Sequence, residues 1–371
     1  MGGQERFCEG IAVLTASLHN EVHVITQSTG RKENHEIING VKIHRINPLI
    51  RYSKACLMPS IKQKIRKLEP DIIHIQGISP GMADFVEKKN NNRIIMTWHN
   101  DPILADNPIY KILVFIYRKF VFPKVVAKLD KIILPSEYLK YHSKFITMVP
   151  SEKITVIPNA VDLDKFSPGD KNKDECKKEI SVFSKFLISF AASMDPQHAY
   201  KGVEILLHAI AQVKNLDVFF VLVGEGDLKQ KYVELATSLG ISDKVKFTGW
   251  VDDDTLIKYY RASDVFVLPS ISTEVMPIVI IEAMACGTPV ITTRIHGPME
   301  MISDGRNGYV VDPGDPKMLA SAIIDILSNE SNLLQMQKNS RLETQEKYSW
   351  HVVLNKYFRE YGINVGNDNY A

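Results

Sequence analysis

The sequence is poor in cysteine, and none of its cysteines is placed for metal or redox chemistry. Its 371 residues include only Cys8, Cys56, Cys176 and Cys286, and no two of them form a Cys-x-x-Cys pair. This wide scatter excludes the common zinc-binding and redox motifs. We therefore expect free thiols in a reducing compartment.

The sequence also lacks a long apolar run and a strong net charge. No stretch reaches eighteen apolar residues and no signal-peptide pattern opens the chain, so we expect neither a transmembrane helix nor secretion. The formal net charge of +2 gives no reason to expect nucleic acid as a partner. A hydrophobic content of 45% and a charged content of 24% are ordinary for a globular protein, and the length allows two domains. We predict a cytoplasmic protein.

One segment, residues 109–126, combines apolar, aromatic and basic side chains. A helix lying in a membrane interface has this composition. A buried helix whose Lys111, Arg118 and Lys119 reach the surface has it too. The buried helix is favoured, because Pro123 interrupts the pattern and apolar positions surround the helix.

Short apolar runs alternate with helical patterns along most of the chain, which predicts right-handed βαβ units and parallel sheets. We expect an N-terminal Rossmann-like domain over 1–163, a polar linker over 164–184 and a second such domain over 185–345. A C-terminal helix within 346–371 is expected to return toward the first domain. Two doubly wound domains of this kind face each other across a cleft, with ligands at the carboxyl ends of the strands.

The start of the first domain is unusual. Gly2 and Gly3 lead into a helical pattern, and a glycine-rich turn before a helix normally follows a strand. No strand pattern precedes the turn here. Either the first strand is missing from the chain as given, or the domain does without it.

The most informative stretch is 270–287, which contains Glu274 and Glu282 across a predicted strand-to-helix junction. Pro277 suits the first turn of a helix, and Gly287 suits its C-terminus. A helix N-terminus offers free N–H groups and a positive dipole end, which together bind phosphate. An isolated glutamate early in a helix is usually only a dipole partner. Two carboxylates beside a phosphate site instead indicate a nucleotide-sugar pocket.

Several motifs in a fixed order resemble the retaining glycosyltransferases of family four, the glycosyl transferases of group 1. In chain order they are Gly2-Gly3-Gln4-Glu5-Arg6, Asp71-Ile-Ile-His74, Thr97-Trp-His99, Val156-Ile-Pro-Asn-Ala-Val-Asp162, Lys201-Gly202, Val223-Gly-Glu-Gly226, Glu274 with Glu282 and Ala-Met-Ala-Cys-Gly287, Gly297-Pro-Met-Glu300 and Asn307-Gly-Tyr-Val-Val-Asp-Pro313. The resemblance covers almost the whole chain. It implies the GT-B fold, two facing Rossmann-like α/β domains with doubly wound parallel sheets.

The resemblance also implies roles for matching residues. Glu282 would bind the ribose hydroxyls of the nucleotide, and Glu274 the hydroxyls of the donor sugar. Lys201 would neutralise the diphosphate leaving group, and His99 would face the donor sugar from the first domain. Backbone groups complete the implied donor site, and they belong to Gly2, Gly3, Val275, Met276, Pro277 and Ile278.

The resemblance implies a hexosyltransferase that uses no metal and no cofactor beyond its nucleotide-diphosphate sugar, with UDP favoured over GDP. The acceptor would be a glycan, a lipid-linked glycan or a small molecule, as in polysaccharide biosynthesis. If residues 109–126 bind an anionic membrane surface, the enzyme would be peripheral at the inner face of the membrane.

The chain departs from the family pattern at two places. A Gly-Arg-Leu triplet usually follows the first strand of the second domain, but this chain has Ala192-Ser193-Met194, so one phosphate-binding cation is absent. A second histidine often follows the position of His74, where this chain has Gln76.

Other interpretations of the motifs stay open. Asp252-Asp253-Asp254 resembles a metal-binding cluster, although the start of a helix explains the triplet better. A sugar-nucleotide epimerase would have the same architecture, but it needs acid and base residues that the sequence does not identify. An inactive nucleotide-sugar-binding subunit is the third possibility, because of the absent strand and Ser193.

Overall fold

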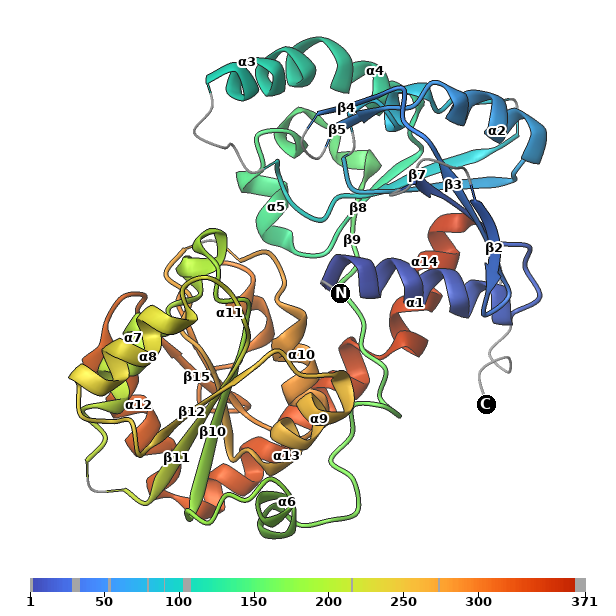
Figure 1. The fold of residues 1–371 in the computed structure, drawn as a ribbon. Coiled ribbons are helices and arrows are strands. Elements are labelled where there is room, and N and C mark those ends of the chain that lie inside the picture. Colours follow the sequence, from blue (N-terminus) through green and yellow to red (C-terminus); the bar gives the residue numbers. More distant parts are fainter. Residues whose placement is uncertain are drawn as a thin grey trace. The chain divides into compact units, whose positions relative to one another are not determined.

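The computed structural model describes residues 3–28, 34–52, 55–78, 80–89, 91–102, 108–214, 216–272 and 274–363. The chain divides into two compact units, each with its own sheets and helices (Figure 1). Unit 1 consists of Met1–Pro158 and Val353–Ala371, and unit 2 of Asn159–Val352. The polypeptide therefore passes from one unit to the other twice.

Unit 2 contains a six-stranded parallel sheet in the order β12-β11-β10-β13-β14-β15. Its strands are β10 (Phe186–Ala191), β11 (Val218–Val223), β12 (Val245–Gly249), β13 (Val265–Leu268), β14 (Val290–Thr293) and β15 (Gly308–Val311). Its helices are α6 (Lys173–Glu179), α7 (Val203–Ile210), α8 (Lys229–Ser238), α9 (Asp253–Ala262), α10 (Ile278–Ala285), α11 (Pro298–Met301), α12 (Pro316–Ser328) and α13 (Glu330–Lys347). The α/β class with a parallel sheet, predicted from the alternating pattern, is confirmed here.

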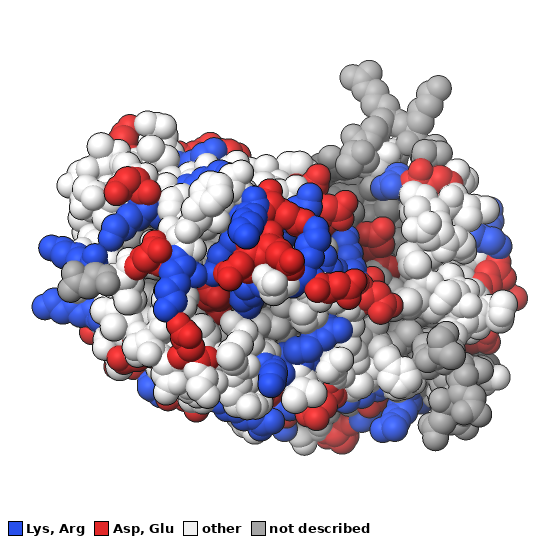
Figure 2. All heavy atoms as spheres, turned by 90° about the horizontal axis from the view of Figure 1, so that it is seen from below, with Lys and Arg blue, Asp and Glu red and all other residues white. Residues whose placement is uncertain are grey.

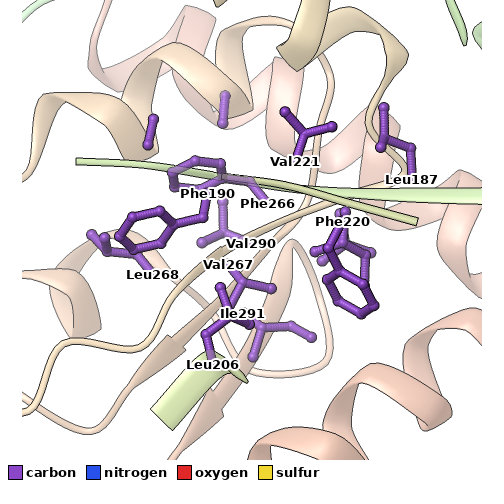
Figure 3. Packing of buried hydrophobic residues seen from close by; sticks show 14 of the residues in the cluster. Leu187, Phe190, Leu206, Phe220, Val221, Phe266, Val267, Leu268, Val290 and Ile291 are labelled. Atoms are coloured by element: carbon purple, nitrogen blue, oxygen red, sulfur yellow. The ribbon is translucent and has the colours of Figure 1, made fainter. Parts of the chain in front are cut away.

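The core of unit 2 lies on both faces of this sheet. Figure 3 shows Leu187 and Phe190 of β10 with Phe220 of β11 and Phe266 of β13, all buried. Every residue of β10 and β13 is buried. Continuous apolar strands of this kind are typical of parallel sheets that helices cover on both sides.

Residues 164–184, for which we expected a linker, contain α6 and form part of unit 2. A capping box between Asn172 and Glu175 begins this helix. The amino group of Lys173 donates to the carbonyl oxygens of Arg261 and Ser263 at the end of α9, and Lys177 forms a 2.9 Å ion pair with Asp264. The polar composition was misleading, because Lys173 binds the C-terminal carbonyls of a neighbouring helix and Lys177 pairs with a carboxylate.

Unit 1 contains two larger sheets and one hairpin. The strands β6 (Ile72–Gln76), β7 (Arg93–Thr97), β8 (Lys131–Leu134) and β9 (Ile154–Val156) form a parallel sheet in that order. A second sheet has the order β1-β3-β2 and consists of β1 (His23–Gln27), β2 (Asn34–Ile38) and β3 (Val41–Ile46). The hairpin joins β4 (Ile50–Tyr52) and β5 (Ala55–Leu57). The helices are α1 (Gly3–Ser17), α2 (Ser60–Leu68), α3 (Pro108–Ile116), α4 (Phe122–Lys128), α5 (Glu137–His142) and α14 (Trp350–Tyr361).

The C-terminal helix α14 completes the core of unit 1. Its Tyr357 hydroxyl lies 3.1 Å from the Thr97 hydroxyl at the end of β7, and its ring packs 5.7 Å from Phe7 of α1. The Tyr361 hydroxyl lies 2.7 Å from Nδ1 of His74 in β6. Residues at the two ends of the sequence therefore share one core.

The favoured interpretation of residues 109–126 as one buried helix was wrong for its first half. α3 has no buried residue, and a π-helical turn over Tyr117–Val121 separates it from α4, whose Phe122, Val125 and Val126 are buried. Apolar residues on all sides indicated burial, but α3 lies along the outside of unit 1 (Figure 1).

Among the helices of the described residues, none is long and apolar enough to cross a membrane. The face drawn in Figure 2 carries interspersed acidic and basic side chains.

Candidate functional site

The strand order of unit 2 reverses beside β10, and this reversal locates the candidate site. From β10 the chain moves outward through β11 to β12, then returns to add β13 on the other side of β10. In doubly wound sheets, ligands bind at the carboxyl ends of the strands at such a switch point. The segments that follow β10 and β13 contain Lys201 and Glu274, respectively.

Lys201 and Glu274 form an ion pair between the Lys201 amino group and Oε1 of Glu274. The same oxygen accepts a 2.9 Å hydrogen bond from the Ser270 hydroxyl. Glu274 is only 6% exposed, so its charge depends on these two donors. The predicted diphosphate cation and the predicted sugar-binding carboxylate are thus brought together. Ser270, which sequence reasoning did not single out, belongs to the same cluster.

Two glycines hold the segments around Glu274 in close contact. Gly202 has φ +80°, and a Cβ atom there would lie 2.0 Å from the carbonyl oxygen of Pro269. Gly297 has φ +86°, and a Cβ atom there would lie 2.2 Å from the carbonyl oxygen of Glu274. Only glycine fits either position without displacing the backbone. Gly202 therefore fixes the segment after β10 against the segment after β13.

The second glutamate lies inside α10. Glu282 is 3% exposed, and its Oε2 accepts a 3.1 Å hydrogen bond from the hydroxyl of Tyr260 in α9. Pro277 is the N-cap of α10 and thus immediately precedes the helix, and Gly287 follows its C-terminus with φ +74°. Tyr260 is a contact of Glu282 that the sequence analysis missed, since nothing in the spacing of α9 and α10 indicates it.

The start of α10 is fixed by the segment that opens unit 2. The Asn159 side-chain amide donates to the Met276 carbonyl oxygen at 3.2 Å, and the Asn159 backbone N–H contacts the Met276 sulfur at 3.2 Å. Met276 and Pro277 are buried, whereas Val275 and Ile278 are partly exposed. The backbone around Met276, which we predicted to bind phosphate, is thus held in place by Asn159.

Tyr200 lies beside the ion pair, and Asp195 belongs to the same segment after β10. Burial raises the pKa of the Tyr200 hydroxyl, and the negative charges of Glu274 and Asp195 raise it further. The Lys201 amino group lies 5.3 Å from the centre of the Tyr200 ring. Burial acts to raise the pKa of Asp195, but hydrogen bonds from His198 outweigh it and hold that pKa below its usual value. The segment after β10 therefore carries one neutral phenol and one ionised carboxylate.

In unit 1, His99 belongs to a chain of hydrogen bonds. Its Nε2 lies 2.9 Å from Oε1 of Gln76, whose amide nitrogen lies 3.2 Å from Nδ1 of His74. Burial lowers the pKa of His99 to about 4, and burial together with the His99 charge lowers that of His74 to about 3. Both rings are therefore neutral near pH 7. Gln76, which departs from the family pattern, is the residue that connects them.

The remaining predicted residues have the following positions. Gly2 lies outside the described residues, and Gly3 is the first residue of α1. Asp252 caps α9 by accepting from the Thr255 N–H at 2.8 Å, and Asp253 forms a 2.6 Å ion pair with Lys165. Within the part of the chain that the structure describes, no three histidine, cysteine or carboxylate side chains are grouped to hold a metal ion.

Two family models match different parts of the chain. The profile described as "Glycosyl transferases group 1" matches residues 177–343, and the one described as "Glycosyltransferase Family 4" matches residues 1–165. The chain is 28% identical to an uncharacterized glycosyltransferase of Methanocaldococcus jannaschii, over 98% of this chain and 95% of that protein. It is 27% identical to spore coat protein SA of Bacillus subtilis, over 95% and 92%, respectively.

Two solved structures share the fold. A glycosyltransferase from Rickettsia africae has a TM-score of 0.78 at 23% identity, over 97% of this chain and 94% of that one. HepE of Anabaena, solved with UDP and glucose, has a TM-score of 0.72 at 19% identity, over 96% and 95%. The expected GT-B fold is thereby confirmed.

Proposed function

Because the chain belongs to the group 1 glycosyltransferases, we propose that it transfers a sugar from a nucleotide-diphosphate donor to a glycan, lipid-linked or small-molecule acceptor. The observation that carries this proposal is the Lys201–Glu274 ion pair at the switch point of unit 2. Unit 2 is the proposed donor-binding unit and unit 1 the proposed acceptor-binding unit. UDP is the favoured donor nucleotide over GDP, and the UDP and glucose held by the Anabaena protein of the same fold support it.

The Lys201–Glu274 ion pair suits a site in which both residues exchange each other for the donor when the donor binds. A diphosphate carries more negative charge than one carboxylate, so it competes with Glu274 for the Lys201 amino group. Once Lys201 turns to the diphosphate, Oε1 of Glu274 becomes an acceptor for a sugar hydroxyl. Ser270 keeps its hydrogen bond to Glu274 and holds the carboxylate in place. Glu282 is proposed to bind ribose.

The proposed reaction retains configuration at the anomeric carbon and needs no metal. Negative charge grows on the leaving diphosphate as the glycosidic bond breaks, and Lys201 is a fixed cation for that charge. A diphosphate oxygen takes the acceptor proton on the same face of the sugar. His99 donates from Nε2 to Gln76, which leaves Nδ1 as a neutral acceptor for a donor-sugar hydroxyl.

Product analysis tests this proposal. The chain is incubated with UDP-sugars and GDP-sugars and a panel of acceptors, and NMR of the product reports the anomeric configuration. We expect transfer with retention from a UDP-sugar. An inverted product contradicts the proposed mechanism. Interconversion of free sugar nucleotides would indicate an epimerase, and binding without turnover an inactive subunit.

We also propose that α3 holds the enzyme at the inner face of the membrane, near a lipid-linked or cell-surface glycan acceptor. Five of its apolar side chains are 44–63% exposed, and they are Ile109, Ile112, Leu113, Phe115 and Ile116. The cationic groups of Arg118 and Lys119 lie 6.0 Å and 5.9 Å from the Phe115 ring. Exposed apolar groups on α3 and basic groups on the π-helical turn that follows it suit an anionic membrane surface.

Sedimentation with anionic vesicles of phosphatidylserine and phosphatidylcholine tests the membrane proposal. We expect binding at low salt that Phe115→Glu weakens at least about tenfold, because a charge replaces an apolar anchor. Ile37→Glu is the control, since Ile37 is 70% exposed on β2, outside α3. No binding at low salt, or equal loss in both variants, contradicts the proposal.

A further inference from the structure

Unit 2 contains a cavity of about 320 Å³ for which the proposed donor site has no use. Ala199, Ile205 of α7 and Ile271 give it apolar walls. Two tyrosines, Tyr200 and Tyr232 of α8, also line it. Its volume lies at the lower end of the range for small-ligand pockets, so it suits one small molecule or one residue of a longer chain.

The cavity shares a wall with the Lys201–Glu274 ion pair but is separate from it. Neither residue of the pair lines the cavity. Tyr200, which lines it, directly precedes Lys201, and Ile271, which also lines it, directly follows Ser270. The Ile271 N–H donates to the Tyr200 carbonyl oxygen at 2.7 Å, which joins the two segments. A ligand in the cavity therefore contacts the same two segments that carry the ion pair and its serine.

Tyr232 gives the cavity a buried hydroxyl group. This residue is 2% exposed, yet its hydroxyl is not sealed from solvent and forms no hydrogen bond within the part of the chain that the structure describes. Burial raises the pKa of Tyr232, and the negative charge of Glu204, which also lines the cavity, raises it further. Buried hydroxyls normally have a hydrogen-bond partner, so we expect the partner of Tyr232 to be a ligand in the cavity.

We propose that this cavity binds one neutral sugar residue of a glycan. A sugar ring has apolar C–H faces that pack on aromatic rings, and its hydroxyls both donate and accept hydrogen bonds. The hydroxyls of Tyr232 and Ser272 can donate or accept, and the Glu204 carboxylate accepts. Among the described residues, no lysine or arginine lines the cavity, which disfavours a phosphate. A purely apolar ligand would leave the Tyr232 hydroxyl without a partner.

The mouth of the cavity favours a residue of a glycan over a free sugar. Ile271 is 46% exposed, and Ala199 and Ser272 are exposed as well, so the rest of a chain can leave on this side. If the glycan is the acceptor or product of this enzyme, the cavity holds it on the same unit as the donor between transfers. This consequence rests on the proposed function, whereas the binding itself does not.

Sugar binding to the full chain, measured without donor, tests the proposal. The probes are glucose, galactose, mannose and N-acetylglucosamine, each as the free sugar and as its methyl glycoside, and NMR titration gives the affinities. We expect saturable binding of at least one methyl glycoside, and exchange of the Ile271 amide should slow at least about threefold when it binds. Both readouts are independent of catalysis, so a protein that binds sugar but transfers none contradicts the proposed function alone.

Three variants locate the bound sugar. Tyr232→Phe should weaken binding about three- to tenfold, the usual effect of one lost hydrogen bond. Ile205→Trp should abolish binding, because the larger side chain fills the cavity. Tyr259→Phe is the control and should change nothing, since Tyr259 is a 6% exposed tyrosine of α9 that does not line the cavity. The Tyr232 variant keeps the test decisive even if Ile205→Trp does not fold.

Several outcomes overturn the proposal. If none of the sugars binds saturably, the cavity is not a sugar site. Equal weakening by Tyr232→Phe and Tyr259→Phe, or binding that a folded Ile205→Trp variant retains, places the sugar elsewhere. Inorganic phosphate that displaces the sugar would show an anion site instead. Binding of free sugars but of no methyl glycoside contradicts a glycan as the source.

Discussion

At the scale of single residues, the proposed site is defined by charges that are buried together. Lys201 and Glu274 are both largely buried and each neutralises the other. Removing one partner of a buried pair leaves the other charge uncompensated. Substitutions here should therefore affect both activity and stability.

Lys201→Ala should lower turnover by about 10²–10³, the usual effect of losing one preorganised group that stabilises charge in the transition state. The arginine that the family usually has after the first strand of the second domain is replaced here by Ser193, which is exposed and carries no charge. Lys171→Ala is the control, because Lys171 pairs with Glu179 at the surface of unit 2. Near-normal turnover of the Lys201 variant would show that another group neutralises the diphosphate, and the Asp252–Asp254 segment would be the first place to look for a metal.

The two glutamates should differ in kinetics. Glu282→Ala should raise KM for the donor more than it lowers kcat, because ribose is bound equally in the ground and transition states. Glu274→Ala should lower kcat itself, because its carboxylate is proposed to contact the reacting sugar. Tyr260→Phe removes one hydrogen-bond donor to Glu282 and keeps the Glu282 carboxylate, so it should have a smaller effect than Glu282→Ala. An identical fall in kcat with unchanged KM in both glutamate variants would contradict this division of roles.

The buried histidines of unit 1 make stability depend on pH. Their pKa values, about 3 for His74 and about 4 for His99, lie below the ordinary 6.5. As the pH falls below about 6.5, the unfolded chain binds more protons than the folded chain, so the free energy of unfolding decreases. For His74 the steepest slope is about 1.4 kcal/mol per pH unit.

Urea unfolding between about pH 5 and pH 7 measures this slope. His74→Gln should flatten it without abolishing it, because burial also lowers the pKa of His44, to about 4. A slope that is the same in the variant would show that His74 does not titrate differently in the folded and unfolded states.

At the scale of elements, local patterns predicted the site well where they reflected backbone geometry. The junction from β13 to α10 was predicted from Pro277 and Gly287, which the structure places at the two ends of α10. The strand β2 was missed, although Asn39 and Gly40 both have positive φ and form the two-residue turn before β3. An Asn-Gly pair is a strong hairpin signal, so the sequence contained this information.

Long-range contacts decided the elements that the sequence did not predict. α6 contacts its neighbours through Lys173, which binds the end of α9, and Lys177, which pairs with Asp264, whereas α3 is exposed although apolar residues surround it. Composition alone cannot give either result, because lysines that bind protein oxygens and an exposed apolar helix both depart from the usual preference. In the site, the contacts Ser270–Glu274 and Tyr260–Glu282 were missed for the same reason.

Gly202→Ala should destabilise unit 2 more than an ordinary glycine substitution at positive φ. The new methyl group would meet the Pro269 carbonyl oxygen, so the segments after β10 and β13 would have to separate. Gly240→Ala is the matched control, with φ +67° and no atom within 4 Å of the new group. It should cost only about 1 kcal/mol of backbone strain. Chemical denaturation compares the two, and equal costs would contradict the close approach at Gly202.

At the scale of the whole molecule, α14 makes unit 1 depend on the last part of the chain. Ending the chain after Ser349 removes Tyr357 and Tyr361, whose hydroxyls contact Thr97 and His74. We expect hydrogen exchange to increase at least about tenfold in β6 and β7, while β10 and β11 keep their protection. Exchange that stays slow in β6 and β7 would show that unit 1 does not need α14.

The double passage between the units has a consequence for biosynthesis. Unit 2 is continuous in sequence, so all of its residues have been synthesised once Val352 has left the ribosome. Unit 1 begins earlier but acquires Tyr357 and Tyr361 only afterwards. The N-terminal half is thus translated first and completed last, against the usual order in which N-terminal domains fold first during translation. While unit 2 emerges, the apolar surface around Phe7 has not yet received α14, and this is the interval in which a chaperone would be most useful to the nascent chain.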